Sequence, residues 1–415
     1  MPAFRAAIAA AETRQFGASF PYMASESVFI VAAKRTPIGS FMGALSALPA
    51  PRLGAVAIRE ALASAKLQPA AVDEVFMGNV LSAGIGQAPA RQASIFAEIP
   101  NTVPTTTVNK VCGSGLQAVV LAARSILLGD ASIAVAGGME SMSNVPYYLR
   151  NARSGYRMGD GKLVDGMIFD GLWDPYNDFH MGEAGELCAS TYGFDRASQD
   201  TFAAQSYRRA KLAIERGEFK NEIAGVDVPQ PKGEPARVDT DEEPGRGDPA
   251  KFAKLRPAFK KDGTITAANA SSINDGAAAL VLASEASVKS LGLEPLARIV
   301  GWGAAAQAPE WFTTAPAKAM QLTLKKLGLG ASDIDLYEIN EAFSCVTQAC
   351  AKELELDPER VNVRGGAVAL GHPIGASGAR VLTTLLHAMH DRGARRGLAT
   401  LCIGGGEAVA VVVER

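Results

Sequence analysis

The sequence lacks the residue patterns that mark several large classes of protein. Its five cysteines are scattered and odd in number, and none belongs to a CxxC pair, which argues against a disulfide framework or a zinc site. The 41 basic and 43 acidic residues nearly cancel, so there is no basic excess for nucleic acid. No apolar run reaches the length of a membrane span, because Arg124 and Asp130 interrupt the best stretch, 118–138. We therefore expect a cytoplasmic protein without a metal, a membrane or a nucleic acid as partner.

Length and composition indicate a globular protein with more than one core. Of its 415 residues, 48% are hydrophobic and 7% aromatic, which supplies two or more core-bearing units. Residues 1–23 differ from the rest, because they are rich in alanine and carry Arg5 and Arg14 against one acid, Glu12. This segment has the features of a weak transit peptide, which would make the protein mitochondrial, but also those of an upstream start or a tag remnant. We expect residues 1–26 to stand outside the core.

Two parts of the chain repeat one pattern. A helical segment, 53–66, leads through a loop to a strand candidate at 75–79, and a second helical segment, 317–327, leads to a strand candidate at 336–340. Both strands end in asparagine. Each part continues with a Val-Asn pair, a glycine-rich turn, an alanine- and leucine-rich helix pattern and a strand that ends in Gly-Gly. The repeat predicts two similar α/β halves.

The region between the repeats, 143–273, has a different character. Its stretch 229–262 is rich in proline, glycine and charge and has no sustained period, which is typical of a long excursion on the surface. Helical spacing occurs in 198–219. A local basic run is either a solvated face or a phosphate-binding patch, and consists of Lys251, Lys254, Arg256, Lys260 and Lys261.

Cys112 lies in a frame that favours chemistry over packing. It follows an apolar strand candidate and precedes Gly113-Ser114-Gly115, a tight turn that opens a helix. The partial positive charge of the helix N-terminus favours a thiolate, and the glycines let a substrate approach the backbone. A lone cysteine is usually a small core residue. The glycine frame and the groups described next favour a nucleophile instead.

His372 is the second candidate. Glycines are too dense in 365–380 for a regular strand or helix, which predicts a shaped turn before a helix that begins near Ser377. A neutral imidazole held there can take the thiol proton of Cys112 and then hydrogen-bond an oxygen that becomes negative. A structural histidine bonded to backbone is the alternative. His387 and His390 lack a third ligand nearby, and we expect them on a surface helix.

Cys402 ends an apolar strand candidate and is followed by three glycines, so its thiol and the following amides would share one pocket. Two cysteines in different environments can divide the roles of nucleophile and base. Asn340 can orient a water or a carbonyl, although an asparagine in a turn is a common alternative. The other three cysteines lie in helix-like patterns without glycines, and we interpret them as packing residues: Cys188, Cys345 and Cys350.

These motifs closely resemble the thiolase family from about residue 28 to 413. The resemblance is carried by VCGSG around Cys112, NEAF from Asn340, GGAVALGHPIGASGAR around His372 and CIGGG from Cys402, in the order of the family. It implies an α/β thiolase fold, five-layered αβαβα, built from two similar halves with an inserted loop domain, in a homotetramer that is a dimer of dimers. The expected parts are an extension (1–26), an N-terminal half (27–142 and 274–294), a loop domain (143–273) and a C-terminal half (295–415).

The resemblance implies a reversible ping-pong reaction without a cofactor, in which coenzyme A (CoA) thioesters are the substrates. Cys112 accepts an acetyl group from acetyl-CoA, Cys402 removes an α-proton from a second acetyl-CoA, and the carbanion attacks the acetyl-enzyme to give acetoacetyl-CoA and CoA. His372 and a water on Asn340 would serve the enolate oxygen. The amides of Cys112 and Gly404 would serve the tetrahedral oxyanion.

Residues that contact CoA carry over less evenly. Ser271 resembles the family serine at the pantetheine arm, and four further residues fall where that arm is lined: Leu172, His180, Met181 and Phe343. The triplet from His180 resembles the short-chain members, which favours the acetoacetyl-CoA type. In 242–251 the basic spacing of bacterial members is not reproduced, and Arg246 or Lys251 would substitute at the CoA phosphates.

Three other functions were weighed against this one. A 3-ketoacyl-CoA thiolase for longer chains in fatty-acid β-oxidation is the main alternative. A ketoacyl-carrier-protein synthase shares the duplicated fold but lacks a C-terminal cysteine, so CIGGG argues against it. A catalytically silent CoA-binding protein would have lost a reactive group, and Cys112, His372 and Cys402 are all present.

Overall fold

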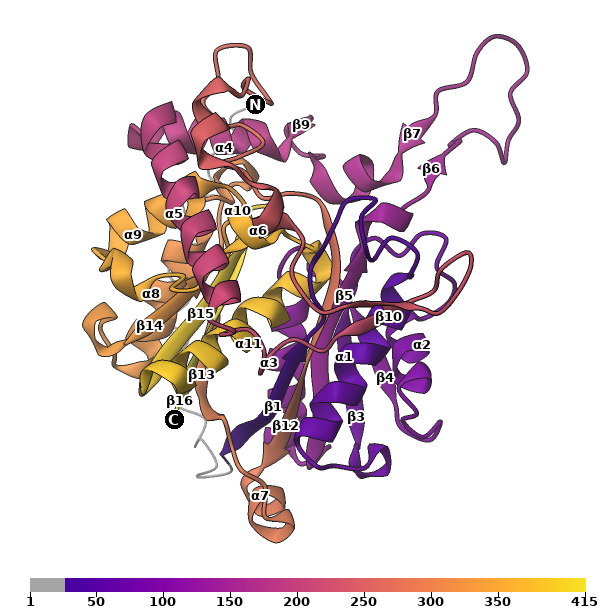
Figure 1. Cartoon of the computed structure of the whole chain (residues 1–415), viewed down its shortest axis with the longest axis vertical. Helices are drawn as coiled ribbons and strands as arrows, with labels where there is room; N and C mark the ends of the chain where they lie inside the picture. Colours follow the sequence, from indigo (N-terminus) through magenta and orange to yellow (C-terminus); the bar gives the residue numbers. More distant parts are fainter. Residues whose placement is uncertain (1–26) are drawn as a thin grey trace, which may run out of the picture.

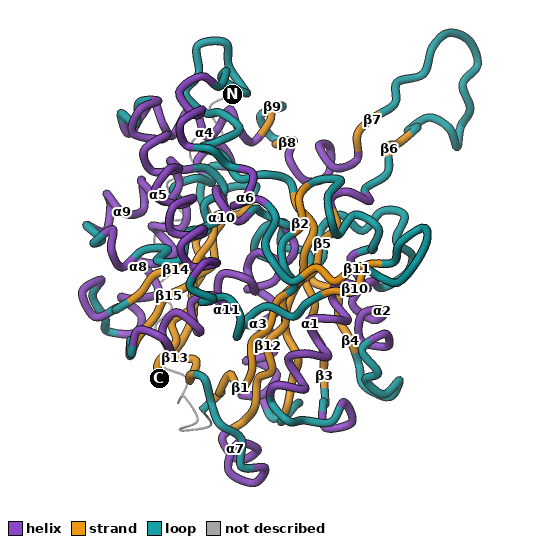
Figure 2. The backbone as a smooth tube through the Cα atoms, viewed as in Figure 1, coloured by secondary structure: helices purple, strands orange, loops and turns teal. Residues whose placement is uncertain are grey.

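The computed structural model describes residues 27–415, so the predicted extension 1–26 lies outside the described residues. A ten-stranded sheet has the order β14-β15-β16-β13-β1-β12-β5-β3-β4, with β2 beside β12 (Figure 2). Two residue pairs, Phe29–Arg298 and Ile30–Ala297, join β1 to β13, so two smaller sheets meet there. The strands are β1 (Val28–Arg35), β2 (Gly39–Ser40), β3 (Glu74–Gly78), β4 (Thr105–Val108), β5 (Ile133–Ser141), β12 (Asn274–Ser284), β13 (Ala297–Ala306), β14 (Leu336–Ile339), β15 (Arg396–Ile403) and β16 (Glu407–Glu414).

The two smaller sheets and their helices form five layers, which confirms the predicted fold class (Figure 1). α1 packs on β12 and β5, and α8 packs on β13 and β16, so these helices are the outer layers. α3 and α11 lie between the sheets, because both contact β5 and α11 also contacts β15. The helices of the two halves are α1 (Ala50–Ser64), α2 (Pro89–Phe96), α3 (Ser114–Leu128), α7 (Glu285–Leu291), α8 (Ala315–Leu327), α9 (Ser344–Leu354), α10 (Ala367–Leu370) and α11 (Ile374–Arg392).

Backbone hydrogen bonds match the halves residue by residue. The amide of Asp73 donates to the Ile133 carbonyl at 2.9 Å, and the amide of Asp335 donates to the Arg396 carbonyl at 2.9 Å. β3 therefore matches β14, and β5 matches β15. Counted from these aspartates, Asn340 corresponds to Gly78. The expectation that both strands end in equivalent asparagines is thus wrong by one residue.

Two glycines bring the inner helices into backbone contact. A Cβ on Gly115 would lie 2.7 Å from the amide nitrogen of Ala379, and a Cβ on Gly378 would lie 2.3 Å from that of Leu116. Only glycine permits this approach. Because each glycine contacts the residue that follows the other, Gly115 and Gly378 occupy equivalent positions in the two halves. The N-terminal ends of α3 and α11 consequently meet. The turns that precede the two helices, with Cys112 and His372, converge at the same place.

Residues 111–128, which include α3, are long and apolar enough by composition to span a membrane, contrary to the expectation from the sequence. Most of this stretch is buried, as in the core helix of a globular protein. α3 packs against both sheets and against α11. Its hydrophobicity is therefore explained by its place in the central layer.

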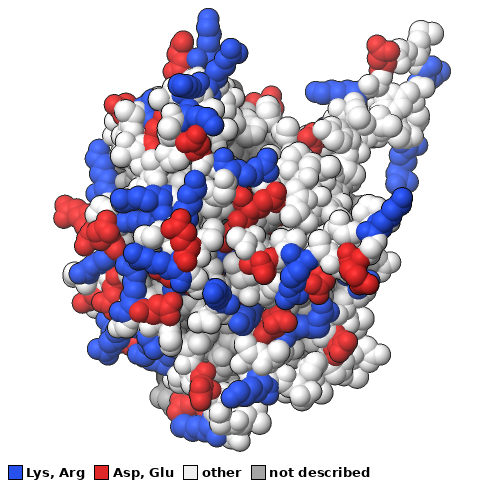
Figure 3. All heavy atoms as spheres, viewed as in Figure 1, with Lys and Arg blue, Asp and Glu red and all other residues white. Residues whose placement is uncertain are grey.

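Most of residues 143–273 lie over one end of the layered core, and the loop between β6 and β7 projects from them as an arm (Figure 1). Acidic and basic side chains are intermingled over the visible face, as the near-zero net charge leads one to expect (Figure 3). The elements of this region are β6 (Tyr147–Tyr148), β7 (Val164–Asp165), β8 (Trp173–Asp174), β9 (Phe179–His180), α4 (Met181–Tyr192), α5 (Arg196–Glu215), β10 (Val226–Val228), β11 (Ala236–Val238) and α6 (Glu243–Arg246).

α11 differs from its prediction in two respects. It begins at Ile374 rather than near Ser377, with Pro373 as its N-cap residue. It is also not a surface helix, because nearly all of its residues are buried between the sheets. The Nε2 atom of His387 lies 3.0 Å from the Ala33 carbonyl oxygen. Within residues 27–415, no group of three potential ligand side chains is arranged to hold a metal ion.

Candidate active site

A pocket of about 220 Å³ lies where the turns of the two halves converge. Most of the residues predicted for the site line it: Cys112, Leu172, His180, Met181, Ser271, Phe343, His372 and Gly404. Cys402 and Asn340 are fully buried and do not line it. Arg246 lies elsewhere. Segments from both halves and from the loop domain therefore form one cavity.

Cys112 is presented to this pocket by a strained turn. The preceding residue, Val111, has φ of 46°, in the left-handed region that β-branched residues rarely adopt. Ser114 fixes the turn, since its hydroxyl donates to the Val111 carbonyl at 2.6 Å and accepts from the Lys110 amide at 2.8 Å. Backbone strain of this kind persists only where the surrounding structure holds it, and such positions cluster at functional sites.

The Cys112 thiol is not a resting thiolate, contrary to the expectation from its place before a helix. Burial raises its pKa to about 11, although the amides of Gly404 and of Cys112 itself hydrogen-bond toward the sulfur and lower the pKa. Loss of hydration thus outweighs the positive end of α3. A nearby base is needed to remove the proton.

His372 has the protonation state that such a base requires. Its Nδ1 lies 2.6 Å from the Ser377 hydroxyl, which donates to the Pro373 carbonyl at 3.0 Å, and so accepts from the ring. This network assigns the ring hydrogen to Nδ1 and leaves Nε2 with a free lone pair. Nε2 is buried without a protein partner. Burial and then the charge of Arg380 lower the imidazole pKa to about 3.

The His372 backbone is fixed as well. Its amide donates to the Asn274 side-chain oxygen at 2.9 Å. Gly371, just before it, has φ of 100°, and a Cβ there would lie 2.4 Å from the Asn274 amide carbon, so both conformation and space require glycine. The dense glycines of this segment therefore shape the turn as predicted.

Cys402 lies behind the pocket at the end of β15. Its side chain is fully buried, and burial raises its pKa well above the ordinary value, with a further contribution from Cys112. The loops that carry the two cysteines abut, because a Cβ on Gly113 would lie 2.4 Å from Ile403 Cδ1. Lys110 and Glu407 form an ion pair between these loops.

Asn340 is buried, yet neither its side-chain oxygen nor its nitrogen has a protein partner. Its backbone is held, since its amide donates to the Thr400 carbonyl at 3.0 Å. A buried amide without partners costs stability, and native proteins usually satisfy such groups with water or a ligand. The side chain is thus free to bind something other than the protein.

Aromatic residues close the pocket, and two of these were not predicted from the sequence. His180 stacks on Phe259 with 4.8 Å between ring centroids, and Phe343 meets Phe259 and Phe312 edge-on at 6.0 and 6.5 Å. Ser271 donates through its hydroxyl to the Ala342 carbonyl at 2.9 Å. Phe259 and Phe312 carry no motif, so only the fold brings them to the site.

Arg246 and Lys251 line a separate hollow of about 260 Å³. Arg246 pairs with Glu242 at 3.6 Å, and Lys251 pairs with Asp248 at 3.1 Å, while both basic side chains remain largely exposed. Residues 267–268 line this hollow and 270–273 line the pocket, so one segment of chain separates the two. The predicted phosphate contacts therefore do not belong to the pocket of Cys112.

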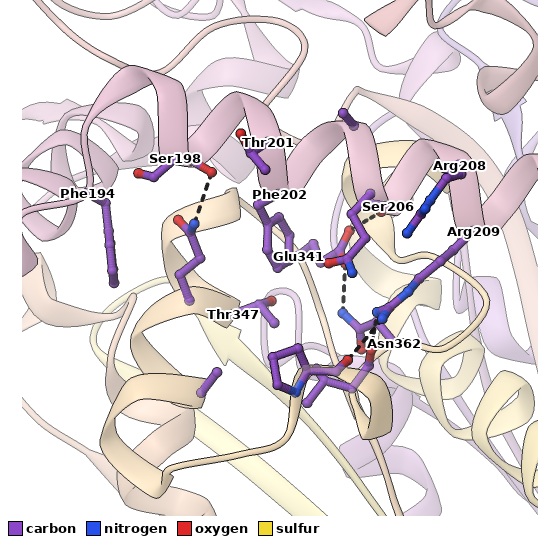
Figure 4. Close-up of a pocket in the computed structure, with 16 residues that line it drawn as sticks. Phe194, Ser198, Thr201, Phe202, Ser206, Arg208, Arg209, Glu341, Thr347 and Asn362 are labelled. Atoms are coloured by element: carbon purple, nitrogen blue, oxygen red, sulfur yellow. Dashed lines mark hydrogen bonds between the residues drawn. The ribbon is translucent and has the colours of Figure 1, made fainter.

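A larger groove, of about 690 Å³, lies between α5 and α9 (Figure 4). None of the candidate catalytic groups lines it. The groove reaches Glu341, the neighbour of Asn340, whose carboxylate accepts from Ser206 at 2.7 Å and Asn362 at 2.8 Å. The bond from Ser206 ties the Asn340 loop to α5, and the bond from Asn362 ties it to the segment that precedes α10.

Comparison with known proteins agrees with this arrangement. Residues 28–286 match the family model of the thiolase N-terminal domain, and residues 293–415 match that of the C-terminal domain. An acetyl-CoA acetyltransferase of Schizosaccharomyces pombe is 52% identical over 95% of this chain and 100% of its own. One of Pseudomonas aeruginosa is 54% identical over 94% and 100%. Among solved structures, the Acat5 thiolase from Ascaris suum in complex with coenzyme A is similar with a TM-score of 0.89 and 46% identity, over 94% of this chain and 100% of that one.

Proposed function

The chain belongs to the thiolase family, and from this premise we propose that it is an acetyl-CoA C-acetyltransferase, which condenses two acetyl-CoA to acetoacetyl-CoA and CoA and catalyses the reverse thiolysis. The observation that carries the proposal is the convergence of Cys112, His372 and the Gly404 amide on one small pocket, with Cys402 directly behind it. Thiol, base and oxyanion donors are the groups that acyl transfer needs.

In the first half-reaction, His372 Nε2 takes the proton of the Cys112 thiol. The resulting thiolate attacks the carbonyl carbon of acetyl-CoA, and the carbonyl oxygen becomes an oxyanion. The amides of Cys112 and Gly404, which already converge on the sulfur, stabilise that oxyanion. When the oxyanion collapses, the leaving CoA thiolate takes the proton of the Cys402 thiol, which becomes a thiolate, while His372 keeps the Cys112 proton on Nε2 and the acetyl group stays on Cys112.

In the second half-reaction, Cys402 removes an α-proton from a second acetyl-CoA. The enolate oxygen needs preorganised donors, each worth about 3 kcal/mol of barrier. His372 and a water held by Asn340 fill this role, and the unpartnered atoms of both side chains support it. The α-carbon attacks the acetyl-Cys112 carbonyl, which gives acetoacetyl-CoA and returns Cys112 to the thiol through His372.

The pocket supports a short acyl chain over a long one. Its volume is about 220 Å³, and Phe259, Phe312 and Phe343 pack edge-on around it. A long-chain 3-ketoacyl-CoA would need space that these rings fill. Arg246 or Lys251, beside the neighbouring hollow, would meet the CoA phosphates at the rim. We also propose that the protein is a cytoplasmic homotetramer and that residues 143–273 act as its loop domain.

The test is thiolysis of 3-ketoacyl-CoA substrates from four to sixteen carbons, together with acetoacetyl-CoA formation from acetyl-CoA alone. Activity confined to the four-carbon substrate, with condensation, is the expected result. Activity on long chains would assign the protein to fatty-acid breakdown, and no activity on any substrate would leave only a CoA-binding role. A tetramer is expected in light scattering, with a dimer or monomer contradicting that part.

A further inference from the structure

Glu140, on β5, is a buried carboxylate that receives an unusually complete set of hydrogen bonds. It is fully buried. One oxygen accepts from Asn79 Nδ2 at 2.8 Å and from the Leu81 amide at 3.2 Å. The other accepts from the Val80 amide at 3.0 Å and from the Gly375 amide at 2.9 Å. Four donors from two distant segments therefore converge on one side chain.

The two segments that Glu140 joins both lie against the catalytic pocket. Residues 79–81 follow β3 in the N-terminal half, and Leu81 lies near Gly171 and Ile374, which line the pocket. Gly375 is in the first turn of α11, three residues after His372. The N-cap residue of α11, Pro373, has no capping side chain. Glu140 thus places a carboxylate at the open N-terminus of the helix that carries the His372 turn.

We propose that Glu140 is a positioning residue of the reaction, whose charged carboxylate holds the His372 turn of one half against the Cys112 half. The contact is close enough to exclude a side chain at position 375, since a Cβ on Gly375 would lie 2.6 Å from the Glu140 oxygen. The carboxylate touches no reacting atom in the proposed mechanism. It acts through the position of His372 Nε2 relative to the Cys112 sulfur.

The charge of Glu140, and not only its shape, is required. Each carboxylate oxygen faces two donors, so a glutamine of the same shape would point its NH₂ group at two N–H groups in either orientation. Burial raises the pKa of Glu140 to about 7 even though its bonds to the amides of Val80, Leu81 and Gly375 lower it, so the carboxylate is fully charged only above about pH 8. Nearby Asp275 acts in the same direction as burial.

The same charge also acts electrostatically on the nucleophile. Glu140 contributes to the raised pKa of the Cys112 thiol, after burial, so its removal should ease ionisation of that thiol. A variant without the charge is therefore expected to alkylate faster at Cys112 and yet turn over more slowly. General damage to the fold does not predict this combination at a single thiol.

The experiment compares Glu140→Gln with Glu222→Gln in the full-length protein. Glu222 is an equally buried glutamate that bonds Arg35 and Thr384 away from the pocket, so its variant controls for loss of a buried charge. At about pH 8.5, where Glu140 is charged in the wild type, we expect kcat of thiolysis by Glu140→Gln to fall at least about tenfold with KM within about twofold, and iodoacetamide to modify Cys112 several-fold faster. Site-resolved mass spectrometry reports the modified cysteine.

A kcat of Glu140→Gln within about twofold of that of Glu222→Gln would overturn the proposal, and so would unchanged alkylation of Cys112. If Glu140→Gln does not fold, Asn79→Ala removes one of the four donors and should lower kcat about two- to fivefold with KM unchanged; full activity would then count against the role. The inference rests on the proposed function. Alkylation needs no turnover, and an inactive wild type would refute the proposed function while leaving the alkylation comparison valid.

Discussion

The two halves of the molecule share one scaffold, but matching positions of the scaffold carry opposite kinds of residue. Cys112 precedes Gly115 by three residues, as Gly375 precedes Gly378, so the nucleophile stands opposite a glycine. By the same count His372 matches Asn109. Along the matched strands, Cys402 corresponds to the buried Met139 and Asn340 to Gly78.

At three of these four positions one half supplies a reactive or polar group and the other supplies a residue that packs or leaves space, whereas His372 corresponds to Asn109, a polar residue that bonds only its own turn and the Val80 carbonyl. A Cβ on Gly78 would lie 2.7 Å from Ser114 Cβ, so the first half has no space for a side chain at this position. The second half has the unpartnered side-chain amide of Asn340 there. Neither half holds a complete set. The catalytic pocket is therefore a property of their contact, and the loss of symmetry marks the functional positions.

The largest effect is expected for Cys112→Ala, which removes the reactive side chain from the first half, so that neither half has one at this position. We expect thiolysis to fall at least about 10⁴-fold and no acetyl-enzyme to form, because no other thiol can hold the acyl group there. Radiolabelled acetyl-CoA with intact-mass analysis measures both. Cys350→Ala, in the buried face of α9, is the control that should keep the label. Label retained by Cys112→Ala would contradict the assignment.

The next prediction compares two buried asparagines, Asn340, whose side chain has no protein partner, and Asn79, whose side chain has two. Loss of the amide in Asn340→Ala should lower kcat about 10²- to 10³-fold, because a donor to the enolate is lost, while thermal stability stays level or rises, because an unpartnered buried group is removed.

In the first half, replacing Asn79 by alanine should lower the stability of the fold. Asn79→Ala removes bonds to Glu140 and Met139 and should lower the free energy of unfolding by about 1–2 kcal/mol. Kinetics and chemical denaturation of both variants measure the contrast. Equal loss of stability in the two would show that Asn340 is an ordinary packed residue.

Gly78→Ala tests whether the first half can tolerate a side chain where the second has Asn340. The added Cβ would meet Ser114, Gly115 and Gly375 at 2.7 to 2.8 Å, so we expect a loss of about 1–3 kcal/mol in the free energy of unfolding. Gly245→Ala, where no atom lies within 4 Å, should change it by less than about 0.5 kcal/mol. Similar midpoints in urea for both variants would refute the close contact.

The last expected effect is on the pH dependence of stability. His372 has a lowered pKa of about 3 when folded, so the unfolded chain binds more protons below pH 6.5 and the free energy of unfolding falls as pH drops. This group contributes a slope of at most about 1.4 kcal/mol per pH unit. His372→Asn, which copies Asn109, should have a shallower slope between pH 4 and 6.5. Parallel plots of the free energy of unfolding against pH for the wild type and His372→Asn would mean that His372 is not held neutral in the folded protein.

The sequence was sufficient to predict the halves, the fold class and most of the pocket. Cys112, His372 and Gly404 lie in motifs whose glycines are demanded by local geometry, such as the φ of 100° at Gly371, so a local pattern records their conformation. The roles proposed for these residues stay predictions.

What the sequence could not provide depends on distant segments. The protonation of Cys112 follows from burial by several elements and not from its helix alone. The helix that carries His387 and His390 was expected on the surface, but most of α11 is buried between two sheets, including the polar residues Ser377, Arg380, Thr383 and Thr384. Glu140 and Phe259 have no motif, because their partners are separated from them by up to hundreds of residues.

One feature of the sheet sets the order in which the protein can form. β12 lies between β1 and β5 and pairs with both, yet it follows β5 by the whole loop domain. At a synthesis rate of roughly 5–20 residues per second, the edges of β1 and β5 that will pair with β12 therefore stay unpaired for on the order of ten seconds. Exposed strand edges invite pairing with other chains. Folding yield should consequently respond to translation speed through residues 143–273 and to chaperones that shield the unfinished sheet.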